Sequence, residues 1–165
     1  MSGSKLSFMK ITLLAIGKNK ERYLAEGMQE YIKRMKRYIS FQFTEIQGIK
    51  SSKKYSVPEI KQKEGELLLK SLPSNAFLVL LDDKGKQMNS EAFAGWLKKM
   101  MVESTQHLVF VIGGAYGFSE EVYKKAALKL SFSPMTFSHQ VIRLMFMEQI
   151  YRAFTIIHGE PYHHG

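Results

Sequence analysis

The residues with the most distinctive chemistry form a glycine-rich loop, residues 112–119, that directly follows an apolar run. Gly113, Gly114 and Gly117 permit positive φ angles and let other groups approach the backbone closely. The backbone N–H groups of such a loop could hold a polar ligand. A tight turn before a helix would use the same glycines, so both interpretations stay open.

A second candidate is the loop Ser133–Ser138, which mixes apolar side chains with small polar ones. Such a loop could enclose an adenine ring and hydrogen-bond to its edge through backbone groups. It could equally be an ordinary connection in which Ser138 caps the helix that follows.

Charged side chains and histidines near the C-terminus are the third candidate group. Arg143, Glu148 and Arg152 interrupt an apolar helical pattern, and because buried charge is costly unless paired, each should be paired, exposed or functional. Glu148 and Arg152 can pair because they lie four residues apart on a helix. Three of the five histidines lie in residues 158–165, but they lack the spacing of a metal site, and we expect no metal.

An α/β fold, with a mainly parallel sheet flanked by helices, must position these groups, because strand and helix patterns alternate along the chain. The runs FLVLL and HLVFVI are apolar throughout, which is typical of central strands in a parallel sheet. The predicted strands are Lys10–Ile16, Phe41–Ile46, Phe77–Leu81, His107–Ile112 and Leu128–Phe132. The predicted helices cover residues 22–37, residues 58–72, a segment that begins at Ser90, a segment after Ser119, and His139–Ile157.

Ligands of open α/β sheets bind beyond the carboxyl ends of the strands, so the loops after Leu81, Ile112 and Phe132 define the expected site. The first of these loops is predicted to be a turn over Asp82–Lys86. Residues 17–20, after the first strand, match neither a GxGxxG nor a Walker A pattern, so no nucleotide site is expected there. Any cofactor should therefore bind in the C-terminal half.

The chain has 165 residues, which suits one domain; we assign it to residues 9–165, with residues 1–8 as an extension before a second methionine. Cysteine is absent, which excludes disulfides, thiolate metal sites and cysteine nucleophiles and fits a cytoplasmic protein. The apolar run Ile11–Ile16 is too short for a signal segment or a membrane span, and we expect no membrane association.

Positive charge is concentrated in the first part of the chain. Residues 1–70 contain 15 Lys and Arg against 7 Asp and Glu, whereas residues 71–165 contain 9 against 8. This asymmetry suggests a polyanionic partner, either nucleic acid or an anionic membrane surface, although a solubility surface would look the same. The helix His139–Ile157 is apolar on more than one face, as in a dimer interface or a crowded monomer core.

Several C-terminal segments, in their order and spacing, resemble one family. They are the strand end Leu80-Leu81-Asp82, the loop 110–117, the stretch 130–143, the segment 148–153 and the pair Tyr162-His163. Together they resemble the RlmH family of 23S rRNA (pseudouridine-N3)-methyltransferases, which belongs to the SPOUT class. The match runs from about Met9 to the C-terminus, so it covers the whole predicted domain.

The resemblance implies a trefoil knot in the C-terminal half, S-adenosylmethionine held by three knot loops, and an obligate homodimer whose partner completes the site. The substrate it implies is a pseudouridine of 23S rRNA within the assembled ribosome. On this sequence the cofactor-binding residues would be Leu81, Gly114, Ser133, Pro134, Met135, Thr136, Phe137 and Ser138.

Methylation of N3 of pseudouridine requires loss of the N3 proton, so a base or groups that stabilise the anion would help. The candidates are His139, Arg143, Tyr162 and His163. Arg143 would anchor a phosphate or the uracil oxygens, and Tyr162 and His163 would close over the base. His163 would accept the proton, because imidazole titrates near neutrality. The family commonly continues after Tyr-His with Lys or Arg, whereas His164 and Gly165 follow here.

The basic N-terminal half would then bind rRNA phosphates with an affinity that falls steeply with salt. Its candidate contacts are Lys33, Arg34, Lys36, Arg37, Lys50, Lys53 and Lys54. The alternative function is a non-catalytic RNA-binding or ribosome-associated protein on the same fold, which the charge asymmetry supports equally.

Overall fold

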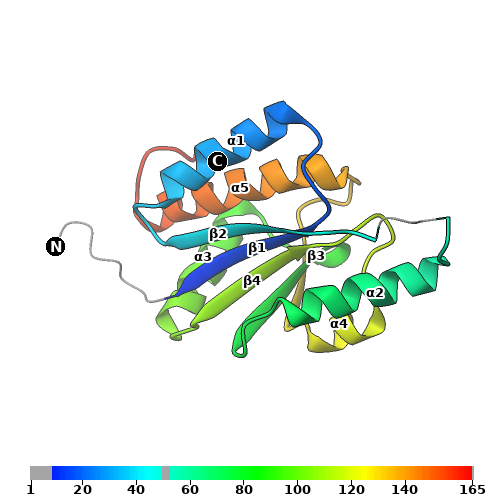
Figure 1. Cartoon of the computed structure of the whole chain (residues 1–165). Coiled ribbons are helices and arrows are strands. Elements are labelled where there is room, and N and C mark those ends of the chain that lie inside the picture. Colours follow the sequence, from blue (N-terminus) through cyan, green and yellow to red (C-terminus); the bar gives the residue numbers. More distant parts are fainter. Residues whose placement is uncertain (1–8, 50–52, 165) are drawn as a thin grey trace.

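Five parallel strands form the central sheet of the computed structural model, which describes residues 9–49 and 53–164 (Figure 1). The strand order across the sheet is β2-β1-β4-β3-β5. The strands are β1 (Lys10–Ile16), β2 (Ser40–Ile46), β3 (Ala76–Gln87), β4 (His107–Ile112) and β5 (Leu128–Ser131). The helices are α1 (Arg22–Met35), α2 (Val57–Lys70), α3 (Ser90–Val102), α4 (Glu120–Lys125) and α5 (His139–Ile157). The predicted α/β fold with a parallel sheet is confirmed.

Helices cover both faces of the sheet (Figure 1). On one face α1, α3 and α5 share an apolar core with strand residues such as Leu13, Val79 and Phe110. On the other face α2 and α4 share a core with Leu14 and Leu80. Because successive strand side chains point to opposite faces, a strand covered on both faces must be apolar at every position. This double coverage explains the uninterrupted apolar runs of β3 and β4.

The third strand is longer than the sequence predicted. Leu130 of β5 pairs first with Leu81 and again with Lys86, so residues 82–85 bulge out of the ladder before pairing resumes. The predicted turn over Asp82–Lys86 is therefore wrong as the end of the strand, which continues to Gln87. Local polarity gave the turn signal, but the neighbouring edge strand β5 supplies hydrogen-bonding partners that bring the polar segment back into the sheet.

Some predictions concern features that the strand pairing does not define. The extension over residues 1–8 and the candidate RNA contact Lys50 lie outside the described residues. The trefoil knot implied by the resemblance is not specified by strand order and register, and it stays a prediction.

None of the helices among residues 9–49 and 53–164 combines the length and the apolar character that crossing a bilayer would demand.

Candidate active site

A cavity of about 410 Å³ opens at the carboxyl edge of the sheet, where β3, β4 and β5 end or bulge. Its walls come from residues 81–84, residues 112–118 and a set of residues between 130 and 142, with Lys61 and Tyr123 at the side. These segments include all three loops that the sequence placed at this edge. The volume lies within the usual range of about 300–1,000 Å³ for small-molecule sites.

Most of the predicted cofactor-binding residues line this cavity. Those that do are Leu81, Gly114, Ser133, Met135, Thr136 and Phe137. Pro134 and Ser138 are not among the described residues that form its walls. The Ser138 hydroxyl instead accepts a hydrogen bond from the Val141 N–H at 3.2 Å and caps α5. The loop before α5 thus serves both of the purposes considered for it, since it bounds a cavity and also begins a helix.

Large apolar side chains are unusually exposed around this cavity. Met135 is 71% exposed, Tyr116 46% and Phe137 38%, and each of them lines the cavity wall. Scattered exposed apolar side chains are normal in proteins, but a contiguous exposed group is typical of a binding surface. All three are therefore apolar side chains that a covering group could bury at this cavity.

A buried carboxyl group packs against Gly114 and leaves no room for a side chain at this position. A Cβ built on Gly114 would lie 2.7 Å from Oε1 of Glu64, a buried residue of α2. Oε1 has no hydrogen-bond partner among the described residues, while the N–H of Ile49 donates to the carboxyl group. Burial raises the pKa of Glu64, and the Ile49 hydrogen bond opposes that rise. The sequence left open whether this glycine serves a ligand or a turn, and in this chain a side chain at residue 114 would meet Glu64.

Asp82 and Tyr123 form a polar pair in the cavity wall that sequence reasoning did not single out. The Tyr123 hydroxyl donates to Oδ2 of Asp82 at 2.7 Å, and the Lys84 N–H donates to Oδ1 at 2.9 Å. Burial opposes ionisation of Asp82, but these hydrogen bonds outweigh it and lower the pKa of the carboxyl group. Burial and the bond to Asp82 raise the pKa of Tyr123 to about 12. The wall therefore carries a fixed carboxylate, and the signal for it was the position of Asp82 directly after an apolar strand.

His139 is the one predicted catalytic residue that lines the cavity among the described residues. It is the first residue of α5, and its side chain is exposed at the cavity wall. Partial burial, and then the positive charge of Arg143, lower the pKa of its imidazole. The ring is consequently neutral near neutral pH and can accept a proton.

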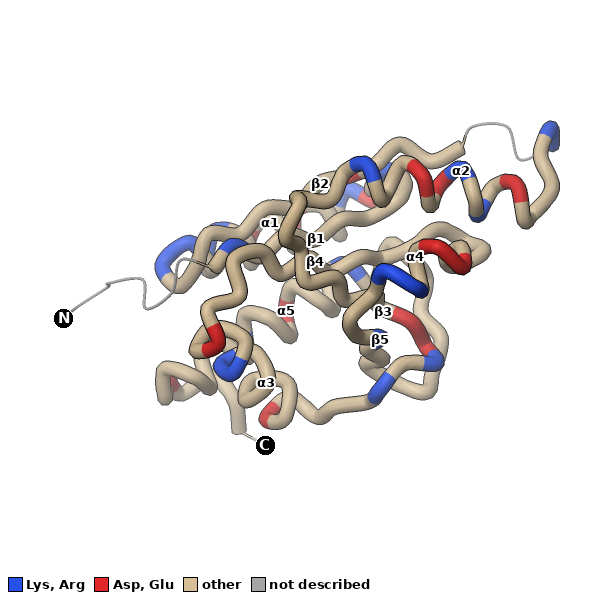
Figure 2. The backbone as a smooth tube through the Cα atoms, turned by 90° about the horizontal axis from the view of Figure 1, so that it is seen from below, with Lys and Arg blue, Asp and Glu red and all other residues tan. Residues whose placement is uncertain are grey.

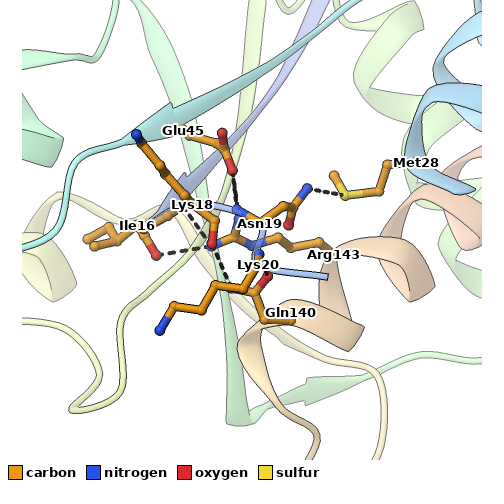
Figure 3. A network of polar contacts seen from close by, with 9 residues as sticks. Ile16, Lys18, Asn19, Lys20, Met28, Glu45, Gln140 and Arg143 are labelled. Carbon is orange, nitrogen blue, oxygen red and sulfur yellow. Dashed lines mark hydrogen bonds and ion pairs between the residues drawn. The ribbon is translucent and has the colours of Figure 1, made fainter. Parts of the chain in front are cut away.

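Arg143 lies one turn further along α5 and is fully buried, facing the ends of β1 and β2 (Figure 3). Its Nη2 donates to the carbonyl oxygens of Ile16 and Gly17, both at 3.0 Å. Its Nη1 donates to Oδ1 of Asn19 at 3.0 Å and to Oε2 of Glu45 at 3.2 Å. Of the three situations considered for this charge, the structure places it in a buried pair, and its predicted role as an anchor for substrate stays a prediction.

Tyr162 and His163 lie beside the C-terminal half of α5 and are not among the described residues of the cavity wall. The Tyr162 hydroxyl donates to Oε1 of Glu148 at 3.2 Å. The His163 ring contacts Nη1 of Arg152 at 3.0 Å and Oε1 of Glu91 at 3.5 Å. Burial, followed by hydrogen bonding to Tyr31, raises the pKa of Tyr162, so this phenol stays protonated.

The predicted pair of Glu148 and Arg152 is confirmed, at 2.6 Å, and it organises this second group. Glu148 also lines another cavity, of about 520 Å³, which shares Leu130 and Phe132 with the first. Within one chain the four catalytic candidates therefore lie in three places. His139 lines the first cavity, Arg143 is buried against β1 and β2, and Tyr162 and His163 lie with Glu148 and Arg152.

The chain matches the model of a known protein family. A family model described as "Predicted SPOUT methyltransferase" matches residues 9–163. The chain belongs to this family, and it is an enzyme of the methyltransferase class.

Curated relatives carry a more specific name. A protein of Parabacteroides distasonis is 53% identical over 156 residues, which cover 94% of this chain and 99% of that protein. Proteins of Bacteroides thetaiotaomicron and Flavobacterium johnsoniae are 51% and 50% identical over the same length and with the same coverage. All three are named "Ribosomal RNA large subunit methyltransferase H".

Removal of the Arg143 side chain should destabilise the protein strongly. We expect Arg143→Leu to lower the free energy of unfolding by about 2–4 kcal/mol, because two carbonyl groups lose their buried donor, while the partly exposed Glu45 can be hydrated. Urea denaturation measures this loss. Arg152→Leu is the matched control, since it removes a more solvent-exposed arginine from the same helix and should cost clearly less. Equal losses for the two variants would contradict the role assigned to Arg143.

Gly114→Val should destabilise the loop through Glu64. We expect the free energy of unfolding to fall by about 1–3 kcal/mol, because the new side chain overlaps the Glu64 carboxyl group. Glu64→Ala removes that group, so the double variant should lose less stability than the sum of the two single losses. A double-mutant cycle by chemical denaturation measures the coupling. Additive losses would show that the valine does not meet Glu64.

Proposed function

We propose that this protein is a homodimeric enzyme that methylates N3 of a pseudouridine in 23S rRNA of the assembled ribosome, with S-adenosylmethionine as methyl donor. The observation that carries the proposal is the cavity bounded by three loops at the carboxyl edge of the sheet, in a chain of the SPOUT methyltransferase family. The relatives named for the large ribosomal subunit support rRNA as the substrate. Such a substrate would place the enzyme in the cytoplasm.

The residues of the cavity suit S-adenosylmethionine. Apolar side chains such as Leu81, Ile112 and Ile142 offer contacts for an adenine ring, and Ser133 and Thr136 offer hydroxyl groups. The glycine backbone at residues 113–114 leaves room for a ligand to approach main-chain N–H groups. When bound, this cofactor supplies a sulfonium methyl group that is already electrophilic, so the enzyme has mainly to align the acceptor with it.

The chain itself must remove the proton from the acceptor nitrogen. In this proposal His139 would accept the proton, which its position in the cavity wall and the lowered pKa of its imidazole support. Arg143 acts through its position, because its buried hydrogen bonds fix the start of α5 and hence the location of His139. His163, the other proton acceptor considered, would have to leave its contacts with Arg152 and Glu91 or act in another subunit.

A second subunit would complete the site with its tail. Tyr162 and His163 lie away from the cavity of their own chain, and the exposed Met135 and Phe137 leave the mouth of that cavity open to cover. In a dimer, the tail of one chain would close over the cavity of the other. The protonated Tyr162 would then donate a hydrogen bond to the target base, and His163 would lie near its N3.

Basic side chains outside the cavity would hold the rRNA backbone. Figure 2 shows Lys and Arg positions gathered at one end of the molecule beside α1, whereas basic and acidic positions alternate along α2. The group beside α1 comprises Lys33, Arg34, Lys36 and Arg37. Arg34 is paired with Glu30 and Arg37 with Glu160, so the two lysines contribute most of the uncompensated charge. Lys53 and Lys54 precede α2 and would form a separate contact with the rRNA backbone.

The substrate is tested on ribosomes from a strain that lacks the gene. Purified protein and S-adenosylmethionine should add one methyl group to a pseudouridine of the large-subunit rRNA, as read by mass spectrometry of nuclease fragments. Calorimetry with S-adenosylhomocysteine provides the matching binding measurement. An absence of cofactor binding at millimolar concentration would leave the non-catalytic RNA-binding alternative. Cofactor binding with methylation of a different RNA would reject the proposed substrate.

The shared site is tested by mixing two inactive variants. One lacks residues 162–165, and the other carries Gly114→Val in the cavity. If the tail acts on the partner's cavity, a mixed dimer contains one intact cavity beside one intact tail, and methyl transfer should return. The truncated chain alone should still bind S-adenosylhomocysteine. If the mixture stays inactive while mixed dimers form, the tail acts within its own chain; if the truncated chain alone is active, the tail is dispensable.

A further inference from the structure

The loop at the end of β1, residues 17–20, is held unusually firmly for an exposed connection. The Gly17 N–H donates to the carbonyl oxygen of Ile46 at 2.7 Å, and the Asn19 N–H donates to Oε2 of Glu45 at 2.5 Å. Asn19 also places its side-chain amide 3.2 Å from Sδ of Met28. Gly17 has a φ of +95°, a conformation that favours glycine and that turns the chain out of the strand.

The start of α5 fixes the same loop from the other side (Figure 3). Gln140 bridges it, with Oε1 accepting from the Lys20 N–H at 2.9 Å and Nε2 donating to the Lys18 carbonyl oxygen at 3.0 Å. Arg143 adds its bonds to Gly17 and to the side chain of Asn19. Gln140 directly follows His139, which lines the cavity. The loop is therefore fixed one residue away from the cavity wall.

This network presents two lysines to solvent. Lys18 and Lys20 are exposed, whereas Gly17, which precedes them, and Asn19, which lies between them, are half-buried. In Figure 3 both lysine side chains extend from the network and away from Arg143. Neither lysine takes part in any of the salt bridges found among residues 9–49 and 53–164. The network thus fixes the backbone that carries these two uncompensated positive charges, against Gln140, the neighbour of His139 in the cavity wall.

The two expected ligands, S-adenosylmethionine and RNA, differ in charge, and this difference indicates which of them the lysines bind. S-adenosylmethionine carries no phosphate, and its sulfonium and ammonium groups outweigh its one carboxylate, so its net charge is positive and two lysines attract it less than they attract a polyanion. An RNA strand carries one negative charge per nucleotide, and a base that enters the cavity brings its own phosphates to the rim. Lysine binds phosphate as a flexible point charge and reads no base, so a lysine pair positions the strand without specifying its sequence.

We propose that Lys18 and Lys20 form a phosphate-binding subsite for the RNA backbone next to the nucleotide that is methylated. The inference rests on the proposed function and deepens it, since it assigns a substrate contact to the loop after β1. The hydrogen-bonded network makes the contact effective, because the backbone that carries the lysines loses little further entropy on binding. The subsite is distinct from the basic group beside α1, which lies on a different element.

The test compares Lys18→Ala/Lys20→Ala with the wild type and with the control Lys98→Ala/Lys99→Ala. The control removes the same charge from exposed positions in the second half of α3. We expect the first double variant to raise KM for ribosomes lacking the methyl group, with little change in kcat and in affinity for S-adenosylhomocysteine. For this variant, the slope of log affinity for ribosomes against log salt concentration should become shallower by about 1–2. Lys18→Arg/Lys20→Arg should restore KM, since it keeps both charges.

The outcomes separate the inference from the function on which it rests. If the wild type methylates rRNA and the Lys18/Lys20 variant matches the Lys98/Lys99 control in KM and salt slope, the subsite is wrong and the function stands. If kcat falls with KM unchanged, the lysines do not hold the strand, and the inference is equally overturned. If the wild type binds cofactor but methylates no rRNA, the proposed function fails and the subsite fails with it.

Discussion

The buried guanidinium of Arg143 is the interaction on which the carboxyl edge of this sheet depends. A charged group with no exposure to solvent is costly unless its donors are satisfied. Here β1, β2 and the loop between β1 and α1 satisfy Nη1 and Nη2, whereas Nε has no hydrogen-bond partner among the described residues. The first turn of α5 can therefore occupy one position against these strands. Because α5 begins directly after the loop that bounds the cavity, the same contact fixes His139 and the end of that loop. Residues from both ends of the chain are thereby joined in one network (Figure 3).

The cavity is also defined from behind. Glu64 of α2 packs its carboxyl group against Gly114, so the glycine loop lies between the cavity and a buried acidic group. A side chain at residue 114 would push the loop into the cavity or displace the carboxylate. The conformation of this loop hence depends on a helix that contributes only Lys61 to the cavity wall among the described residues. The helix layer on the second face of the sheet thus shapes the site without forming most of it.

Within one chain, Tyr162 and His163 lie apart from the cavity that His139 lines. A cavity of the size of a small cofactor can be built from one chain, because the bulge of β3 and the segments after β4 and β5 supply its walls. The tail that carries Tyr162 and His163 is held along α5 by Glu148 and Arg152, away from that cavity. An arrangement of this kind suits a site shared between subunits, in which the acceptor base is enclosed only when two chains meet.

The sequence by itself determined the order and type of the strands and helices described. Burial on two faces produces apolar runs in the central strands, partial burial produces alternation in the edge strands β2 and β5, and helices carry spaced apolar stripes. It also determined which loops meet, since the carboxyl ends of parallel strands lie at one edge. The predicted end of the third strand at Leu81 is wrong, because the strand continues through its pairing with β5, a long-range contact that local polarity does not report.

Only the tertiary structure decided where individual charges lie. Arg143, Glu148 and Arg152 are spaced on one helix in ways that allowed pairing, exposure or function. Arg143 is buried against Glu45, 98 residues away along the chain, whereas Arg152 pairs with its helical neighbour Glu148. The same holds for Glu64 behind Gly114 and for Lys18 and Lys20 beside the cavity. Such contacts depend on the register of strands and the docking of helices, which bring together groups whose separation in sequence carries no sign of their proximity.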